Sequence, residues 1–391
     1  MRKIISVVTA TRAEYGLLRP LIKSLKDNKN FDVRLAVTGA HLSQKYGYTY
    51  EEILGDELSV DIKIDTLLDS NTSVAATKSM ALTMIEFANY FEILHPDLIL
   101  ILGDRYEMLA ISTTAMMLQI PIAHLYGGDT TEGAIDEAIR HCITKQSYLH
   151  FVSTIDSRNR VCQLGENPER VFVVGELGIE NIKNEELISK EDLSNLLNLD
   201  LNKPFGIVTY HSVTLESQDD TKYQFQNILD ACTHFKNQYN FIFTKSNTDP
   251  NSQVINTMID AYVQKNSNTF CFISLGTKKY LSLLNCCQFV MGNSSSGLIE
   301  VPSFKKPTIN IGNRQKGRLC PDSVINCSNE TEDIIKAIEE SQTNDFRLIL
   351  KNATNPYGDG NTSILINNIL EEWLTNKQIS LMKEFYNYYR R

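Results

Sequence analysis

Short apolar runs alternate with amphipathic segments along the first half of the chain. Residues 4–9, 33–38 and 97–102 are rich in β-branched residues and are typical of strands, whereas residues 74–94 and 107–118 have the apolar spacing that favours helices. This alternation predicts βα units built on a parallel sheet. The same pattern predicts further elements: a helix from about Tyr15, strands at 122–125, 149–153 and 171–174, and a helix at 135–147.

The alternation stops at a polar segment and then begins again. Residues 181–203 are rich in Glu, Asn and Lys and end at Pro204, so we expect a linker there. Beyond it the pattern predicts a second sheet, with strands at 205–209, 241–244, 270–273, 289–291, 308–311 and 324–327. The sequence thus predicts an α/β protein with two doubly wound parallel-sheet domains, at 1–180 and 204–365. Residues 366–391 form a helical C-terminal segment that we expect to cross back to the first domain.

The composition is that of a globular protein. Of the 391 residues, 42% are hydrophobic and 22% are charged, and no eighteen apolar residues follow one another. Neither a membrane span nor extensive disorder is therefore expected. The basic N-terminus runs into the first apolar run without a small-residue cleavage site, which argues against a secretory signal and predicts a cytoplasmic protein.

Cysteines and charge narrow the class of ligand. None of the eight cysteines forms a CxxC pair, and in a reducing compartment they are expected to be free thiols. Because there is no HExxH motif and no His and Cys at ligand spacing, we expect no metal. The formal net charge of −9 disfavours binding to nucleic acid or to a membrane, but it is compatible with a local cationic pocket.

A serine-rich segment, MGNSSSGLIE, follows a strand of the second domain and ends at Glu300. Ser294, Ser295 and Gly297 form a candidate phosphate cradle, because hydroxyls stand there beside the unpaired N–H groups of a helix start. Glu300 lies one turn after Ser296 on the same helix face, where its carboxylate can accept hydrogen bonds from ribose hydroxyls. A serine N-cap is the alternative interpretation, although one capping residue suffices for it.

Two arginines stand just beyond strand ends. Arg12, in TATRAEYG, lies at a helix entrance after the first strand, and Arg314, in INIGNRQKGR, follows a strand of the second domain. Guanidinium groups in such positions can bind a diphosphate through paired N–H donors. A surface ion pair is the alternative for Arg12, and a solvated basic loop is the alternative for Lys316 and Arg318.

Carboxylates follow two neighbouring strands of the first domain. Asp104 follows one strand, and Asp129 and Asp136 follow the next. General acid and base chemistry on a sugar needs such groups, so these three are candidate catalytic residues. Arg105, beside Asp104, is a candidate for binding the substrate.

Two histidines occupy loops after strands, His41 in the first domain and His211 in the second. Both are candidates for contacting a phosphate or a sugar. Glu137 and His141 are interpreted instead as a solvated helix residue and a packing histidine. Since open α/β sheets bind ligands at their carboxyl strand ends, we expect these motifs to meet in a cleft between the two domains.

Taken in order, the motifs resemble those of a known family. They are TRAEYG from Thr11, GDR from Gly103, HLYGGDTTEG from His124 with Asp136 and RHCITK from Arg140, GNSSSGLIE from Gly292, and GNRQKGR from Gly312. Over nearly the whole chain they resemble the hydrolysing UDP-N-acetylglucosamine 2-epimerases, particularly the bacterial enzymes that make N-acetylmannosamine for sialic acid. The resemblance implies a GT-B-like arrangement of two Rossmann-like domains, a UDP-sugar substrate, no cofactor and no metal.

The resemblance also implies a reaction in two stages. UDP is eliminated as C2 loses its proton, which gives a 2-acetamidoglucal, and water then adds so that C2 takes the manno configuration. The implied roles are diphosphate binding by Arg12, Ser294, Ser295 and Arg314, ribose binding by Glu300, contact with the phosphate or leaving group by His211, and acid and base catalysis by Asp104 and Asp136.

The chain departs from the family pattern at one place. Many relatives carry a carboxylate two residues after the strand histidine, where this chain has Tyr126, and the spacing to Asp136 is one residue longer here. Because other bacterial members have an acid placed like Asp129, we take Asp129 as the substitute. A homodimer or homotetramer is expected from the resemblance.

Alternatives remain within and outside this family. The substrate could be UDP-2,4-diacetamido-2,4,6-trideoxyglucose, as in legionaminic acid synthesis, or the enzyme could be a non-hydrolysing epimerase that adds UDP back. From another class, the chain could be a GT-B glycosyltransferase or a sensor that binds nucleotide sugars. A transferase needs an acceptor before it releases UDP, whereas a sensor releases nothing.

Overall fold

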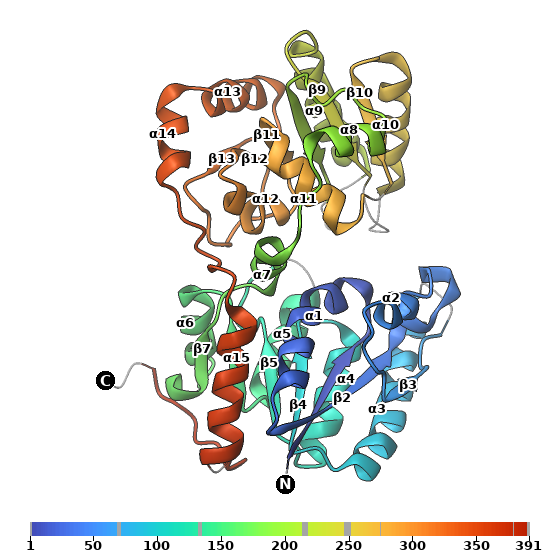
Figure 1. The fold of residues 1–391 in the computed structure, drawn as a ribbon, viewed down its shortest axis with the longest axis vertical. Helices are drawn as coiled ribbons and strands as arrows, with labels where there is room; N and C mark the ends of the chain where they lie inside the picture. Colours follow the sequence, from blue (N-terminus) through green and yellow to red (C-terminus); the bar gives the residue numbers. More distant parts are fainter. Residues whose placement is uncertain are drawn as a thin grey trace. The chain divides into compact units, whose positions relative to one another are not determined.

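The computed structural model describes residues 2–68, 72–131, 135–212, 218–245, 252–273, 275–377 and 379–388 (Figure 1). Glu132 and Gly133, in the motif that begins at His124, lie outside these residues. The chain divides into two compact units. The first unit is Met1–Asn181 together with Tyr357–Arg391, and the second unit is Ile182–Pro356.

A parallel sheet forms the centre of the first unit. Its described strands are β1 (Lys3–Thr9), β2 (Phe31–Thr38), β3 (Ile62–Ile64), β4 (Leu98–Leu102), β5 (Ile122–Leu125), β6 (Leu149–Val152) and β7 (Val171–Val173). They lie in the order β3-β2-β1-β4-β5-β6-β7. All five residues of β4, with the sequence LILIL, are buried, as expected for a central parallel strand covered on both faces.

Helices cover both faces of this sheet. They are α1 (Arg12–Asp27), α2 (Tyr50–Gly55), α3 (Ser73–Leu94), α4 (Tyr106–Met117), α5 (Ile135–Gln146), α6 (Ile155–Gln163) and α15 (Thr362–Glu371), with short 3-10 turns at Gly39–Leu42, Gln44–Tyr46 and Pro168–Arg170 and a π turn at Glu372–Asn376. Alternate residues of β1 face opposite sides, so Ile5 and Val7 pack with α1 and α15, whereas Val8 packs with α3, α4 and α5. The sheet therefore has a core on each face.

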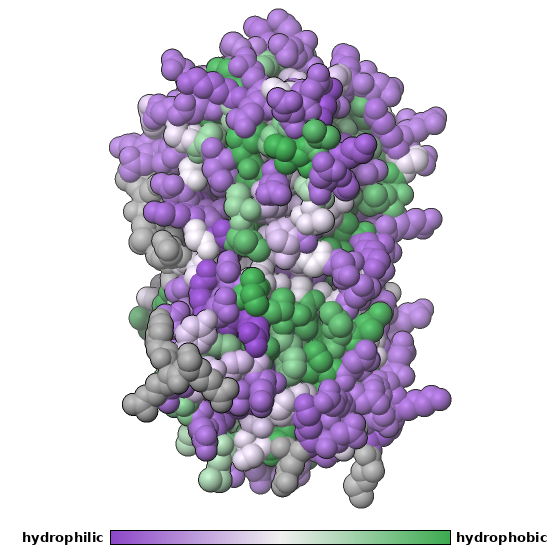
Figure 2. Space-filling model, turned by 90° about the vertical axis from the view of Figure 1, so that its left-hand side faces the viewer, coloured by the Kyte–Doolittle hydropathy of each residue, from purple (hydrophilic) through white to green (hydrophobic). Residues whose placement is uncertain are grey.

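The C-terminal residues return to the first unit. Asn367 of α15 donates to the carbonyl oxygen of Ser24 in α1 (2.8 Å), and Thr362 donates to the carbonyl oxygen of Val174 (2.9 Å). This return begins at Tyr357, ahead of the expected start at residue 366. Figure 2 shows the side of the molecule on which α6, β7 and α15 lie, where an apolar area is visible. The exposed apolar residues of these elements are Ile155, Val173, Ile364 and Leu365.

The second unit is built on another parallel sheet. Its described strands are β8 (Phe205–Thr209), β9 (Asn240–Thr244), β10 (Thr269–Phe272), β11 (Phe289–Gly292), β12 (Thr308–Ile311) and β13 (Val324–Cys327), in the order β10-β9-β8-β11-β12-β13. The helices are α8 (Lys190–Leu197), α9 (Gln218–His234), α10 (Ser252–Lys265), α11 (Gly276–Cys286), α12 (Ser296–Ile299), α13 (Thr331–Ser341) and α14 (Asn344–Asn352), with a 3-10 turn at Val301–Phe304 and with α7 (Leu177–Asn184) crossing from the first unit. One core joins α9, α10, α13 and α14 to the sheet, and another joins α8 and α11 to it.

Residues 182–203, which we expected to be a linker, are part of the second unit. They include α8, whose Leu193 is fully buried and shares a core with Leu199 and Leu201. The polar composition of this segment concealed a short amphipathic helix with one apolar face. β3 was also not predicted, because a strand of three residues is too short to show an alternating pattern.

The structure also bears on membranes, metals and disulfides. No helix in the described ranges is long and apolar enough to cross a membrane. Among the same residues, no group of three or more His, Cys, Asp or Glu side chains is placed to hold a metal ion. All eight cysteines fall within the described residues and are free thiols.

Candidate active site

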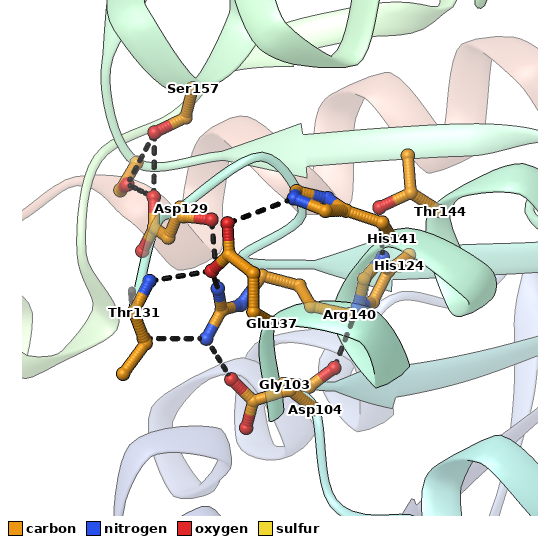
Figure 3. A network of polar contacts seen from close by, with 11 residues as sticks. Gly103, Asp104, His124, Asp129, Thr131, Glu137, Arg140, His141, Thr144 and Ser157 are labelled. Atoms are coloured by element: carbon orange, nitrogen blue, oxygen red, sulfur yellow. Dashed lines mark hydrogen bonds and ion pairs between the residues drawn. The ribbon is translucent and has the colours of Figure 1, made fainter. Parts of the chain in front are cut away.

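Arg140 ties together the loops at the carboxyl ends of β4 and β5 (Figure 3). Its side chain is almost fully buried, and Nη1 donates to the carbonyl oxygen of Asp129 (2.8 Å) and to Glu137 (2.9 Å). Nη2 donates to the carboxylate of Asp104 and to the hydroxyl of Thr131 (2.9 Å). A buried guanidinium requires such acceptors, so Arg140 fixes the position of Asp104 relative to the loop at 129–131.

Glu137 belongs to this network and is not the solvated helix residue that we expected. Its carboxylate accepts hydrogen bonds from the backbone N–H of Thr131 and from Arg140, and it lies 3.1 Å from Nε2 of His141. Partial burial would raise the pKa of Glu137, but the hydrogen bonds of Thr131 and His141 lower it. Glu137 therefore carries a negative charge that balances Arg140 and holds the ring of His141.

Asp104 and Asp136 form a pair of carboxyl groups in different surroundings. Asp104 is ion-paired with Arg140. The side chain of Asp136, one residue before Glu137, makes no hydrogen bond to any described residue, and the pKa of Asp136 lies above the usual 3.8 because of desolvation and, after it, of the charge of Asp104. Two carboxyl groups that interact electrostatically, one of them with a raised pKa, are suited to general acid and base roles.

His124 supports the turn that carries Asp104. Its Nε2 lies 2.8 Å from the carbonyl oxygen of Gly103, and its Nδ1 lies 3.3 Å from the hydroxyl of Thr144. Because a carbonyl oxygen can only accept, the proton is on Nε2 and Thr144 donates to Nδ1. Burial lowers the pKa of His124 to about 3, so the ring is neutral near pH 7.

The loop after β5 is pressed against the start of α6. Gly128 has a φ of +80°, and a Cβ there would lie 2.2 Å from the carbonyl oxygen of Ser157, so only glycine fits. Oδ1 of Asp129 then accepts hydrogen bonds from Ser153 (2.9 Å) and Ser157 (2.6 Å). Tyr126 does not supply the missing acid, since its hydroxyl accepts from the backbone N–H at the start of α7 (2.7 Å).

Arg105 belongs to a second group of charged residues, with Glu14 and Glu107, beside the carboxyl end of β1. Its Nε and Nη2 donate to Glu107 (3.1 and 2.9 Å), and Nε lies 3.9 Å from Glu14. Glu14 caps α1 by accepting from the N–H groups of Ala10 and Thr11 (2.8 and 3.0 Å), while its buried Oε1 accepts no hydrogen bond from the described residues. Burial raises the pKa of Glu14 to about 7, against the opposing charge of Arg105.

Arg12 and His41 are placed less favourably for a ligand. Arg12 is half exposed and pairs with Glu52 (3.1 Å), which is the surface ion pair considered from the sequence. His41 is fully buried, with Nε2 3.0 Å from the hydroxyl of Thr9 and Nδ1 2.8 Å from that of Thr49. Burial lowers the pKa of His41 to about 4. Its two ring nitrogens are occupied within the protein, so in this structure His41 packs inside the first unit.

In the second unit, His211 is held at the junction of β8 and β11. The side-chain amide of Asn293 accepts from the N–H of His211 and donates to its carbonyl oxygen, both at 2.7 Å. Gly292, with a φ of +136°, lets the two strands converge, because a Cβ there would lie 1.8 Å from the carbonyl oxygen of Thr209. In the order of this sheet, β8 and β11 flank the point where the order reverses, which is where ligands bind in such folds.

Beside this junction, Glu300 is linked to the serine-rich segment. Ser296 donates to Oε2 of Glu300, and the hydroxyl of Tyr280 lies 2.7 Å from the hydroxyl of Ser296. Burial raises the pKa of Glu300 against the hydrogen bond of Ser296. Ser294 and Ser295 precede α12 and are partly exposed, so their hydroxyls can be reached by a ligand.

Arg314 and Gly297 frame the same segment. Nη1 of Arg314 donates to the carbonyl oxygen of Asn293 (3.0 Å), which places the arginine beside the serines. Gly297 is buried, and a Cβ there would lie 2.7 Å from the Cγ2 of Thr308. Gly297 therefore allows close packing of α12 on β12, so it shapes the segment without being exposed to a ligand.

The sequence analysis assigned no role to the residues that hold the candidates in place, although several of them lie within the motifs quoted there. These are Arg140 as the central donor, Glu14 and Glu107 around Arg105, Asn293 and Gln315 beneath Arg314, and Tyr280 beside Ser296. Only the T-x-x-E spacing of Thr11 and Glu14 gave a signal, because it is that of a capping box.

Comparison with known proteins gives consistent matches. The profile of the family described as UDP-N-acetylglucosamine 2-epimerase matches residues 23–371. The chain is 42% identical over 347 residues to the GDP/UDP-N,N'-diacetylbacillosamine 2-epimerase (hydrolyzing) of Campylobacter jejuni, covering 88% of this chain and 89% of that protein. It is 37% identical over 387 residues to the polysialic acid biosynthesis protein P7 of Escherichia coli, covering 99% and 98%.

The fold has close counterparts among solved structures. A UDP-GlcNAc 2-epimerase from Neisseria meningitidis, bound to UDP-GlcNAc, aligns with a TM-score of 0.79 at 20% identity, covering 95% of this chain and 100% of that one. With two parallel-sheet units and such neighbours, the chain has a GT-B-like fold, which confirms the predicted class.

Proposed function

This chain belongs to the UDP-N-acetylglucosamine 2-epimerase family, and from that premise we propose that it is a hydrolysing 2-epimerase. The proposed reaction converts UDP-N-acetylglucosamine and water to N-acetylmannosamine and UDP. The name of the relative in Campylobacter jejuni, which includes the hydrolysing type, and the link of the Escherichia coli relative to polysialic acid synthesis support this reaction. On the same grounds, we propose that the N-acetylmannosamine formed is used for the synthesis of sialic acid.

The observation that carries the proposal is the pair of acids at the carboxyl end of β4 and the start of α5. The C2 hydrogen of the sugar is weakly acidic, so elimination needs a carboxylate to take the proton and to steady positive charge as the bond from C1 to oxygen breaks. Asp136, whose pKa is raised, is suited to exchange that proton. Asp104, whose position is fixed by its ion pair with Arg140, is the group that we propose to face the developing oxocarbenium.

In the hydrolytic stage the same acidic groups return a proton to C2, whereas in the first stage they remove one. Water adds its oxygen to C1 of the 2-acetamidoglucal, and a proton is delivered to C2 on the face that gives the manno configuration. A group that has taken a proton in the first stage, or a second acid beside it, can return one. We propose Asp129 as a positioning residue for this stage, because its Oδ1 is held by Ser153 and Ser157.

For the leaving group, we propose residues of the second unit. Ser294, Ser295 and Arg314 offer donors for the diphosphate, and Glu300 offers an acceptor for ribose hydroxyls. Stabilising the departing diphosphate lowers the barrier, because charge builds up there in the transition state. We propose His211 as a further phosphate contact, since Asn293 fixes its backbone beside these residues.

A second substrate is favoured by a specific observation. The 42% identical relative from Campylobacter jejuni is named for N,N'-diacetylbacillosamine, whose sugar carries a 4-acetamido group and a 6-methyl group. UDP-2,4-diacetamido-2,4,6-trideoxyglucose would undergo the same elimination, since only C4 and C6 differ. Turnover of this sugar and not of UDP-N-acetylglucosamine would replace the proposed substrate but keep the proposed chemistry.

A proton NMR time course in deuterium oxide tests the proposal, with each UDP-sugar in turn and without acceptor. We expect free UDP and N-acetylmannosamine carrying deuterium at C2. Asp136→Asn should slow UDP release by about 100-fold or more while UDP binding, measured by calorimetry, is unchanged. The control is Asp156→Asn, in the first turn of α6, which removes an acid outside the network of Figure 3 and should leave turnover normal. Absence of UDP release with both sugars would contradict the proposal.

A further inference from the structure

A cavity of about 540 Å³ opens at the carboxyl ends of β12 and β13, within the second unit. It lies between the loop at 312–320 and the residues that follow β13. Its volume falls in the range of small-molecule sites. The Asn310 side chain, from β12, donates to Oδ1 of Asn326, its register partner in β13, at 2.7 Å (Asn310 Nδ2 to Asn326 Oδ1).

Three residues of this lining carry a buried amide oxygen that has no hydrogen-bond partner among the described residues. Asn310 and Gln315 are each 5% exposed, and Oδ1 of the first and Oε1 of the second accept no hydrogen bond within the described residues. Their orientation is set by the opposite amide nitrogens, since Nε2 of Gln315 donates to the carbonyl oxygen of Asn293 (2.8 Å). Oδ1 of Asn329 is a third such atom on the same lining. Because an unsatisfied buried acceptor is costly, these side chains favour a ligand whose O–H or N–H donors they can turn to meet.

The charge of the lining favours an anion. Lys316 and Arg318 are the two ionised side chains on it, both positive, and no Asp or Glu is among the lining residues. This is a local reversal in a chain with a formal net charge of −9. The amide oxygens can accept from hydroxyl groups, and Lys316 and Arg318 can pair with an acidic group. The lining therefore suits a small molecule that has both hydroxyl groups and an acidic group.

The cavity is separate from the proposed UDP site but is joined to it by one loop. Of the proposed UDP residues, Ser294, Ser295 and Glu300 follow β11, whereas the cavity lies at the carboxyl ends of β12 and β13. Arg314 belongs to the loop after β12, which also borders the cavity. Gln315 lines the cavity and also donates to the carbonyl oxygen of Asn293, which accepts from Arg314 as well. A ligand that binds Gln315 therefore also restrains Asn293, whose carbonyl oxygen holds the side chain of Arg314.

We propose that this cavity binds a small polyhydroxylated anion, a sugar phosphate or a hydroxylated carboxylic acid, and that its binding is coupled to UDP binding through Arg314 and Gln315. The binding itself is independent of the proposed function, whereas the coupling rests on it. Reciprocity requires that if the anion changes the affinity for UDP, UDP changes the affinity for the anion by the same factor.

Calorimetry on the full chain tests the site with four probes: N-acetylglucosamine 6-phosphate, gluconate, inorganic phosphate and uncharged N-acetylglucosamine. We expect one-to-one binding of the first or the second, and at least about tenfold weaker binding of the last two, since each lacks either the hydroxyl donors or the charge. Binding of the sugar phosphate alone assigns a phosphate ligand, and binding of gluconate alone assigns a carboxylate. Absence of binding by both would overturn the proposal.

Substitutions in the lining test whether the probe binds in this cavity. The double variant Lys316→Gln, Arg318→Gln and the single variant Asn310→Leu should each weaken the bound probe about tenfold or more. The matched control Lys336→Gln, Lys351→Gln also removes two positive charges from the second unit, at helix positions outside the lining, and should bind as the unchanged protein does. An equal loss in the control would overturn the assignment.

Titration in the presence of saturating UDP separates the cavity from the UDP site. We expect the probe to bind with unchanged stoichiometry and with an affinity shifted by UDP. Complete competition by UDP would mean that the probe occupies the UDP site and would overturn the proposal. If UDP itself does not bind, the proposed function fails, while the titration of the probe alone still decides whether the cavity is a site.

Discussion

The most informative perturbation of stability is Glu166→Gln in the first unit. Glu166 is 1% exposed, and its carboxylate lies 2.6 Å from Nζ of Lys145, 3.0 Å from Nζ of Lys383, 3.6 Å from Nη2 of Arg170 and 3.3 Å from Nε2 of His150. Lys383 belongs to the C-terminal segment, so this carboxylate joins that segment to the body of the unit. The substitution keeps the shape of the side chain but leaves several cations without their counter-charge.

The expected loss follows from the pKa of Glu166. Burial alone would raise this pKa, but the hydrogen bond and charge of His150, the hydrogen bond of Lys145 and the charge of Lys383 lower it from 4.5 to about 2. A difference of about 2.5 pKa units at about 1.36 kcal/mol each corresponds to about 3 kcal/mol of unfolding free energy. Because the pKa is lower in the folded state, this contribution is complete above pH 4.5 and is lost as the pH falls toward 2.

Urea unfolding followed by tryptophan fluorescence measures this loss. The chain has one tryptophan, Trp373, whose ring lies 5.8 Å from that of Tyr148 in the first unit, so it reports on the unit concerned. At pH 7 the variant should lose about 3 kcal/mol, and the gap to the unchanged protein should shrink by about 1 kcal/mol between pH 4.5 and 3.5. The control is Glu169→Gln, an exposed acid three residues further on. An equal loss in the control, or a gap independent of pH, would refute the reasoning.

Three further predictions concern the candidate site. Arg140→Met should lower kcat about 100-fold or more without weakening UDP binding, because it frees Asp104 from its position. Steady-state kinetics measures kcat and calorimetry measures UDP binding, and a loss of UDP binding in the variant would contradict this prediction. Gly292→Ala should destabilise the second unit by about 3 kcal/mol or more, because the new Cβ would meet the carbonyl oxygen of Thr209, and an unchanged melting temperature in calorimetric scans would count against this. If Asp136 acts as the base, the acid limb of the kcat/KM profile should have its midpoint above pH 3.8, since the raised pKa delays ionisation, and Asp136→Asn should abolish that limb.

Much of the fold could be predicted because parallel strands are buried on both faces. β4 and β5, with the sequences LILIL and IAHL, appear in the sequence as apolar runs, and their predicted positions agree with the structure to within a residue. α8 escaped prediction because only a few of its residues are apolar, so its segment looks polar as a whole. Its burial depends on the second sheet, which no local pattern of the sequence reveals.

The candidate site was predicted less completely than the fold. Asp104 and Asp136 stood out because acids after strand ends are conspicuous in the sequence. Their environment depends on Arg140, which lies 36 residues after Asp104 and meets it only once β4, β5 and α5 have assembled. His41 was predicted as a ligand contact because it follows a strand. The structure shows that Thr49 packs against its ring, and this contact could not be read from the sequence.

The division of the chain also has a consequence for the order in which the protein can be completed during synthesis. Residues 182–356 form the second unit without interruption, whereas the first unit needs residues 357–388 to cover α1 and to supply Lys383 to Glu166. The ribosome therefore delivers the whole second unit before the first can close its core. A chain that stops at residue 356 would release one finished unit attached to one with an uncovered apolar face, and that face would be the first target for chaperones and proteases.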